Sequence, residues 1–311
     1  MKKKTSNLTV ICLLVVIVVY LILNPKDVRE SISFGVSILT DNLFPTLFPF
    51  FVVSNLLISF GFINILSKIF SRVMKFFKMP ASASFPLVIS LFSGFPSGAK
   101  YTTRLAMDGL ISTKQANILL TFTHFSNPLF VFGFIGSIIF NNSLIALIIL
   151  IANIGSGLLV GYIFTRKLEY DNNFNMYNEN SNSSFGEEFA KAIMDALNTL
   201  FLLLGIVVLF IIFNTIVTDF LSLNDFSRSI LSGILEMTIG IKYVSYLDIS
   251  LIFKVLLTTF FISFGGISVH MQVLSIISLA KLKYKYFFFA RILHGLLAMI
   301  LVFILFIILI I

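Results

Sequence analysis

The chain has 311 residues, of which 58% are hydrophobic and 12% charged, and its formal net charge is +8. This composition has too few polar residues to cover a soluble protein of that length, so we exclude that class and expect a helical membrane protein. The basic residues flank apolar segments, which favours a role in membrane topology over nucleic-acid binding. The single cysteine, Cys12, excludes an internal disulfide and a thiolate cluster, and we predict no metal and no cofactor.

Apolar runs long enough to cross roughly 30 Å of hydrocarbon recur along the chain. The first follows Lys2, Lys3 and Lys4, and because no small-residue cleavage site comes after it, we predict an uncleaved span rather than a signal peptide. In chain order the predicted spans are 7–23, 43–60, 116–140, 143–165, 192–217, 250–280 and 287–311. Two further apolar segments, 81–110 and 229–247, are interrupted by polar residues.

A basic amphipathic segment, INILSKIFSRVMKFFKM at 63–79, follows the second span. Its basic residues recur at helical spacing against an apolar face, which favours a helix lying on the membrane surface, with a plain basic loop as the alternative. Most lysines and arginines, Arg291 among them, gather on the cytoplasmic side if the amino terminus is cytoplasmic and if 81–110 and 229–247 are re-entrant hairpins. We therefore predict that orientation.

This orientation divides the chain into two units that run in opposite directions through the membrane. The predicted fold class is an all-α polytopic membrane protein with two inverted repeats, each with a re-entrant hairpin and a broken transmembrane helix. The predicted parts are an N-terminal span with an external loop (1–33), a first repeat (34–168, hairpin 81–110, broken helix 116–140), a polar cytoplasmic linker (169–188) and a second repeat (189–311, hairpin 229–247, broken helix 250–280).

Four short stretches break the helical pattern at corresponding places in the two halves: LFSGFPSGAK, FSNPLF, LEMTIG and FGGISVHMQ. Irregular backbone at membrane depth is tolerated only where protein or a water-filled cavity satisfies its polar groups, so the breaks predict a central polar cavity. The amino termini of half-helices carry partial positive charge and free N–H donors. They suit an anionic group on a substrate.

These stretches also have plainer readings. Gly94 and Gly98 are spaced as a GxxxG helix-packing motif, although Pro96 lies between them, and the Asn-Pro pair at 127–128 is typical of a simple proline kink. The pair Gly157 and Gly161 is predicted to serve ordinary helix packing.

The charged residues at the breaks have alternatives of the same kind. Lys100 and Arg104 follow the first hairpin tip and either face a cavity or snorkel to the surface, because a cation at depth costs about 2.5–3.5 kcal/mol. Glu236 either holds a cation or proton or pairs with a lysine. His124 and His270 each lie beside a break, which favours the cavity over packing, whereas His294 has no neighbouring break and is predicted to be structural.

Taken together and in this order, SLFSGFPSGAK, FSNPLF, LEMTIG and FGGISVHMQ resemble the sporulation integral membrane protein family YlbJ, also called SpoVV. The resemblance covers nearly the whole chain and is most specific over 90–130 and 262–272. That family contains the Gate, or nucleoside-recognition, domain and is similar to the concentrative nucleoside transporters, whose repeats pair a re-entrant hairpin with an unwound helix. The resemblance implies transport of dipicolinate, a small anionic aromatic metabolite, from the mother cell across the outer forespore membrane of a spore-forming bacterium.

The resemblance also implies a substrate site at the two hairpin tips and the two unwound helices. The chain lacks the Gln-Thr-Glu-Ala type hairpin pattern of nucleoside carriers, which weakens nucleoside as the substrate. The implied residues, with His124 added by its position, are Ser93, Gly94, Pro96, Ser97, Gly98, Lys100, His124, Ser126, Asn127, Glu236, Thr238, Gly265, Gly266, Ser268, His270 and Gln272.

Several function classes stay open on the sequence. We favour a transporter whose partners are dipicolinate and the lipid bilayer, with a nucleoside or other small-solute carrier of the Gate type, or a non-transporting sporulation scaffold, as alternatives. An intramembrane hydrolase would use Ser97 as nucleophile and His124 or His270 as base, but no acyl-transfer motif supports it, so we predict that the protein is not an enzyme. The sequence leaves open a coupling ion and a homo-oligomer.

Overall fold

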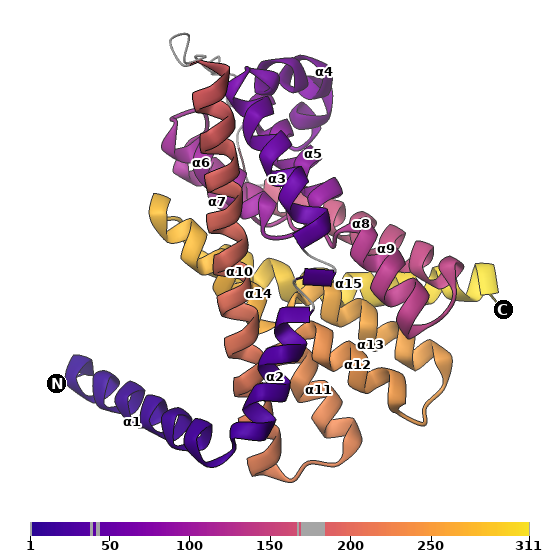
Figure 1. Cartoon of the computed structure of the whole chain (residues 1–311). Coiled ribbons are helices and arrows are strands. Elements are labelled where there is room, and N and C mark those ends of the chain that lie inside the picture. The colour runs from indigo at the N-terminus through magenta and orange to yellow at the C-terminus, as the bar shows by residue number, and fades with distance from the viewer. Residues whose placement is uncertain (1, 38–39, 42–43, 167, 169–183, 311) are drawn as a thin grey trace.

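The computed structural model describes residues 2–37, 40–41, 44–166, 168 and 184–310, and these residues are helical with no strand (Figure 1). Most of the predicted linker, 169–183, lies outside the described residues. The first half contains α1 (Lys2–Leu23), α2 (Pro25–Ser37), α3 (Phe44–Ser59), α4 (Phe62–Phe76), η2 (Ala81–Ala83), α5 (Ser84–Ser93), α6 (Ser97–Met107), α7 (Thr113–Leu119), α8 (Pro128–Phe130), the π-helix η3 (Val131–Ile139) and α9 (Ser143–Thr165). The second half contains α10 (Phe185–Leu221), α11 (Asp225–Leu235), α12 (Met237–Tyr246), α13 (Leu251–Phe264), α14 (Gly266–Ile277), η4 (Ser278–Ala280) and α15 (Tyr284–Ile310).

Helices long and apolar enough to cross a membrane match several of the predicted spans. Among the described residues there are 4 of them, and 5 if the bent pair α3–α4 is counted as one span. The 4 are Ser143–Thr165, Phe185–Leu221, Leu251–Ala280 and Tyr284–Ile310. The chain is thus a multi-pass helical membrane protein, as its composition predicts.

Two predicted boundaries differ from the structure. Residues 25–33, predicted as part of an external loop, lie in α2, because Pro25 suits the first helical position and Asp27 the first turn. The α2 helix packs on α10, and the Ser31 hydroxyl lies 3.0 Å from that of Thr215. The predicted linker extends to residue 188, but Ser184 and Glu187 form a capping box that starts α10 at Phe185.

The α10 helix is the longest element and runs along one side of the molecule (Figure 1). With 37 residues it is roughly 55 Å long, which exceeds the hydrocarbon thickness of a bilayer. It contacts α2, α3, α11 and α14, so it touches elements of both halves of the chain.

The helix α4 turns away from α3 by 90° at Gly61. One face of α4 is buried through Ile63, Leu66 and Met74. A second apolar stripe is exposed: Ile69 is 66% and Phe76 63% accessible. This double apolar face fits the predicted position on a membrane surface, which stays a prediction.

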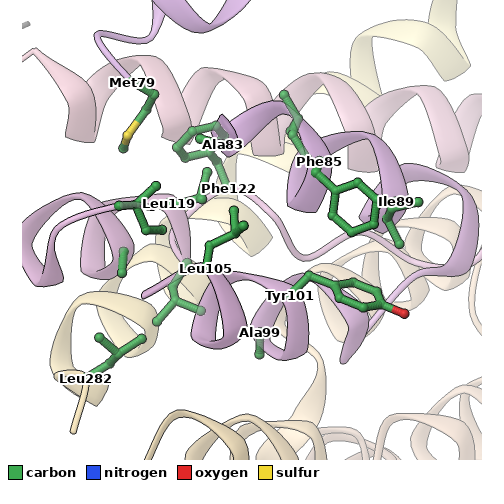
Figure 2. Close-up of a cluster of buried hydrophobic side chains, with 14 of the residues drawn as sticks. Met79, Ala83, Phe85, Ile89, Ala99, Tyr101, Leu105, Leu119, Phe122 and Leu282 are labelled. Carbon is green, nitrogen blue, oxygen red and sulfur yellow. The ribbon is translucent and has the colours of Figure 1, made fainter. Parts of the chain in front are cut away.

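Two large apolar cores hold the molecule together. The first joins α5, α6 and α7 to α14 and the start of α15, and Figure 2 shows part of it, with Phe85 and Tyr101 in edge-to-face contact at 5.2 Å. The second joins η3 and α9 to α12, α13 and α15. Each core therefore combines elements from both halves of the chain.

Candidate functional site

The first hairpin consists of α5 and α6, which pack against each other and are separated by Gly94, Phe95 and Pro96. Gly94 has a φ of 75°, a left-handed conformation that favours glycine. The Ser93 hydroxyl lies 2.5 Å from that of Ser97, and Ser97 donates to the carbonyl oxygen of Gly94. The tip is thus closed by its own side chains.

This tip docks against the irregular segment 120–127, the first break. A Cβ at Gly98 would lie 1.6 Å from the carbonyl oxygen of Thr123, and a Cβ at Gly94 would lie 2.5 Å from the amide nitrogen of Asn127. The Asn127 amide also donates to the Ser93 carbonyl at 3.3 Å. The two glycines therefore allow the tip to approach the break, and they do not form a GxxxG contact along one continuous helix.

The first break is longer than the sequence predicts. The α7 helix ends at Leu119, and helix resumes at Pro128, where the Asn127 side chain accepts a hydrogen bond from the Leu129 amide at 2.7 Å. Pro128 is thus the first residue of a capped helix rather than a kink inside one. Gly157 and Gly161 of α9 receive Phe125 and Phe122 of this break, and Gly157 also faces His294 of α15, so the predicted helix-on-helix packing is only part of their role.

The second hairpin consists of α11 and α12, which also pack against each other. Glu236 lies between them and is 2% exposed. Its carboxylate accepts hydrogen bonds from the amides of Thr238 (2.8 Å) and Ile239 (3.0 Å) and from the Thr238 hydroxyl. No described lysine or arginine pairs with Glu236, and its carboxylate caps α12.

The second break is only two glycines long. Gly265 and Gly266 both have positive φ, and a Cβ at Gly266 would lie 3.1 Å from the amide nitrogen of Met237 at the second hairpin tip. In both halves, therefore, a hairpin tip docks on the break of the next apolar helix. Ser268 and Gln272 are buried on α14 just after this break.

His270 is held by two hydrogen bonds in an aromatic cage. Its Nε2 donates to the Phe264 carbonyl at 3.1 Å, and its Nδ1 pairs with the Tyr284 hydroxyl at 2.7 Å. The rings of Phe264, Phe287 and Phe288 surround it at centroid distances of 4.6, 5.0 and 5.9 Å. His124 lies near the same Phe287 ring at 4.7 Å, so the two histidines share this contact across the halves.

Arg291 of α15 is buried against the first break, with 2% of its surface exposed. Its guanidinium donates to the carbonyl oxygens of Thr121 (2.7 Å) and His124 (2.8 Å). It also donates to Nδ1 of His294 at 2.7 Å. No described carboxylate pairs with it, so its charge is stabilised by backbone carbonyls, an imidazole and the Phe287 ring, whose centre lies 5.4 Å from the guanidinium carbon.

The network continues from His294 into α9 and α13. Because Nδ1 of His294 accepts from Arg291, its Nε2 carries the proton and donates to the Asn153 carbonyl at 2.7 Å. The Asn153 side chain accepts from the Ser126 amide at 3.0 Å and donates to the Ser263 hydroxyl at 2.9 Å. Buried polar contacts thus connect the first break to α9, α13 and α15.

Several polar atoms at this centre have no hydrogen-bond partner among the described residues. They are Nδ1 and Nε2 of His124, the hydroxyl of Ser126 and Nε of Arg291. An unpaired buried donor or acceptor costs about 1–3 kcal/mol, so native proteins seldom keep several near each other without a function.

Lys100 faces away from the hairpin tip, toward α10. Its Nζ donates to the Thr199 hydroxyl at 3.0 Å, approaches the Asp195 carbonyl at 3.5 Å and lies 4.9 Å from the ring centre of Phe51. It lines a cavity of about 580 Å³ together with Arg104, Lys191 and Asp195. Lys100 is thus a predicted site residue that lines a cavity among the described residues. The predicted residues at the tips and breaks, such as Ser97, His124 and Ser268, are buried.

The pairing that a serine hydrolase requires is not formed among the described residues. The Ser97 hydroxyl is bonded to Ser93 and Gly94, neither nitrogen of His124 has a partner, and both nitrogens of His270 are engaged elsewhere. A nucleophile needs a base within hydrogen-bond reach.

The predicted residues at the tips and breaks therefore lie in two clusters, one in each half, while Arg291, Asn153 and His294 were missed as functional candidates. The sequence places Arg291 among the cytoplasmic basic residues and His294 among the structural ones. One available signal was the i, i+3 spacing of Arg291 and His294 within an apolar helix, where ionisable residues are costly.

The chain is similar to known proteins over most of its length. Residues 41–156 match the Gate family, described as nucleoside recognition. The sporulation integral membrane protein YlbJ of Bacillus subtilis (strain 168) is 30% identical over 329 aligned positions, which cover 94% of this chain and 81% of that protein. No solved structure matches the chain. The Gate match includes the first hairpin and the first break and ends before the second half.

Proposed function

Because the chain belongs to the family of the sporulation integral membrane protein YlbJ, we propose that it is a membrane transporter that moves a small anionic aromatic solute during sporulation. The solute that we propose is dipicolinate, carried from the mother cell across the outer forespore membrane, with the amino terminus of the protein in the cytoplasm.

The observation that carries this proposal is the buried polar centre at the first break. Arg291 has no described carboxylate partner there, and His124 and Ser126 keep polar atoms unpaired. A buried cation without a counter-ion is stabilised by an anion that enters, and an intramembrane ionisable residue is by default a candidate for substrate contact. Dipicolinate would bring carboxylates to Arg291 and an aromatic ring to the Phe287 region.

We further propose that the two halves are inverted repeats that open alternately. Each half pairs a docked hairpin tip with a broken helix, which is the arrangement expected of such repeats. The tips are closed on the breaks in this structure, so the solute would enter when a tip separates from its break. The cavity of about 580 Å³ beside Lys100 and Arg104 is large enough for a small aromatic anion and supports an approach from that side.

The driving force of the proposed transport follows from the negative charge of the solute. Moving a dianion out of a compartment with a negative interior is favourable by about 4–5 kcal/mol at 100 mV, so no coupled ion is required. Flux of dipicolinate in vesicles should therefore follow an imposed membrane potential, and indifference to the potential would contradict this mechanism.

The test is flux of labelled dipicolinate into proteoliposomes that contain the purified protein. We expect saturable flux that is lost in His124→Phe, and the melting temperature of this variant in detergent serves as the control for folding. Lys100→Ala should reduce the flux, whereas Lys285→Ala, an exposed matched control, should not. Saturable flux that survives His124→Phe would remove the first break from the solute path, and no flux under any gradient would reject a self-sufficient transporter.

A nucleoside is the second candidate solute, and the Gate match favours it. The same vesicles distinguish the two, because an excess of uridine should leave dipicolinate flux unchanged if the site selects a dianion. Competition by uridine would favour the nucleoside.

A further inference from the structure

A second cavity, of about 540 Å³, lies where the start of α7, the end of α9 and the start of α15 meet. None of the predicted site residues lines it. Its polar wall includes Lys114, Lys283 and Tyr286, and its apolar wall includes Ile118, Ile163 and Phe164. A ligand that fits it needs both a charged group and an apolar part.

The charge of this cavity is positive. Lys114 and Lys283 are both exposed and neither pairs with a described carboxylate, and no described acidic residue lines the cavity. The Asn117 side chain accepts from the Lys283 amide at 2.6 Å and thereby fixes the start of α15 against α7. Two lysine ammonium groups held on adjacent helix ends suit a phosphate.

The apolar wall indicates where that phosphate comes from. Both α9 and α15 are long and apolar enough to span the membrane, and the cavity lies at the end of one and the start of the other, where lipid headgroups lie. Ile163 is 47% exposed, so an acyl chain can cover it, and Tyr286 occupies the position of an interfacial aromatic anchor. A free phosphate would leave this apolar wall uncovered.

We propose that this cavity binds the phosphate headgroup of an anionic phospholipid, with Lys114 and Lys283 on the phosphate and one acyl chain along Ile163 and Ile118. Basic pockets between membrane helices on the cytoplasmic side are typical of such binding. This proposal does not depend on the solute that the protein carries.

The test is native mass spectrometry of the full-length protein released from detergent with added phosphatidylglycerol or phosphatidylcholine. We expect bound phosphatidylglycerol, with retention reduced by about tenfold or more in the double variant Lys114→Gln, Lys283→Gln. The matched control is Lys281→Gln, Lys285→Gln, which removes the same charge from the neighbouring positions that do not line the cavity, and it should retain the lipid.

Three results would overturn the proposal. They are equal retention of phosphatidylcholine and phosphatidylglycerol by the wild-type protein, an equal loss in both double variants, and displacement of the lipid by millimolar inorganic phosphate, which would assign the site to a free anion. Melting temperatures of both variants within a degree or two of the wild type would show that any loss of lipid is not caused by unfolding.

Discussion

Arg291 brings a positive charge into the interior, where three acceptors surround its guanidinium: the carbonyls of Thr121 and His124 and Nδ1 of His294. Removing an ion from water costs several kcal/mol even after relaxation, and the planar fork of arginine recovers part of that cost by donating in several directions at once. The first break has no helical hydrogen bonds of its own at these carbonyls. Arg291 therefore stabilises the irregular backbone, and in the proposed function it also offers a positive charge to the solute.

At this position we predict that lysine does not replace arginine. In Arg291→Lys the ammonium cannot reach both carbonyls and the imidazole, so we expect a loss of about 2–4 kcal/mol and a clearly lower melting temperature in detergent. The matched control is Arg104→Lys, whose ion pair with Asp108 at 3.7 Å lies near the surface and contributes less than about 1 kcal/mol. Equal melting temperatures for the two variants would refute the structural role of Arg291.

The pairing of hairpin tip and break is the recurring element of this fold. The first tip docks through Gly94 and Gly98 on residues 123–127, and the second break docks through Gly266 on the tip at Met237. The contacts are backbone to backbone, so there is no flexible side chain that can move aside. Any added carbon atom at such a contact forces the two elements apart.

For the first hairpin we predict that Gly98→Ala is strongly destabilising, by at least about 3 kcal/mol, because its Cβ would lie 1.6 Å from the Thr123 carbonyl oxygen. Gly205→Ala on α10 is the control, since nothing lies within 4 Å of its added carbon, and it should be neutral or stabilising by up to about 1 kcal/mol. Thermal unfolding in detergent measures both. A Gly98→Ala protein as stable as the control would show that the tip does not dock on the break.

For α4 we predict a position on the membrane surface, with its exposed apolar stripe in the lipid. Ile69 lies on the exposed apolar stripe, whereas Ser71 lies on the polar face. In a Cys12→Ser background, a spin label at Ile69→Cys should be relaxed mainly by oxygen dissolved in lipid, and one at Ser71→Cys mainly by a water-soluble nickel chelate. If both labels respond equally to the nickel chelate, α4 does not lie on the bilayer.

For the whole molecule, orientation follows from charge and from α10. This helix has 37 residues and is long enough to place its two ends on opposite sides of a bilayer of roughly 30 Å. Since lysine and arginine gather on the side of the predicted linker, the start of α10 should be cytoplasmic and its end external.

We test this orientation with single cysteines in the same Cys12→Ser background. On intact cells a membrane-impermeant maleimide should label Asp225→Cys, just after α10, and should label Gly186→Cys, at its start, only after lysis. Both positions are exposed. The reverse pattern of labelling would place the amino terminus outside.

The amino-acid sequence by itself determined the properties that depend on local composition and spacing. Apolar runs gave the helical membrane class and several spanning helices, and glycine and proline located the interruptions at 94–98, 127–128 and 265–266, because those residues disfavour continuous helix wherever they occur. The sequence also indicated the family, since the motifs at those interruptions carry the resemblance to YlbJ. The capping box at Ser184 was present in the sequence as well, although the predicted linker ran past it.

Only the tertiary structure decided which groups face each other. From the sequence, Arg291, two turns into α15, was assigned to the membrane surface. Its burial depends on the packing of α15 against the first break, where the carbonyls of Thr121 and His124 accept its hydrogen bonds. For the same reason the sequence did not show that the cavity beside Lys100 lies toward α10, or that the Glu236 carboxylate caps α12. Contacts between residues more than a hundred positions apart depend on how helices pack, and a single sequence carries no local signal for that packing.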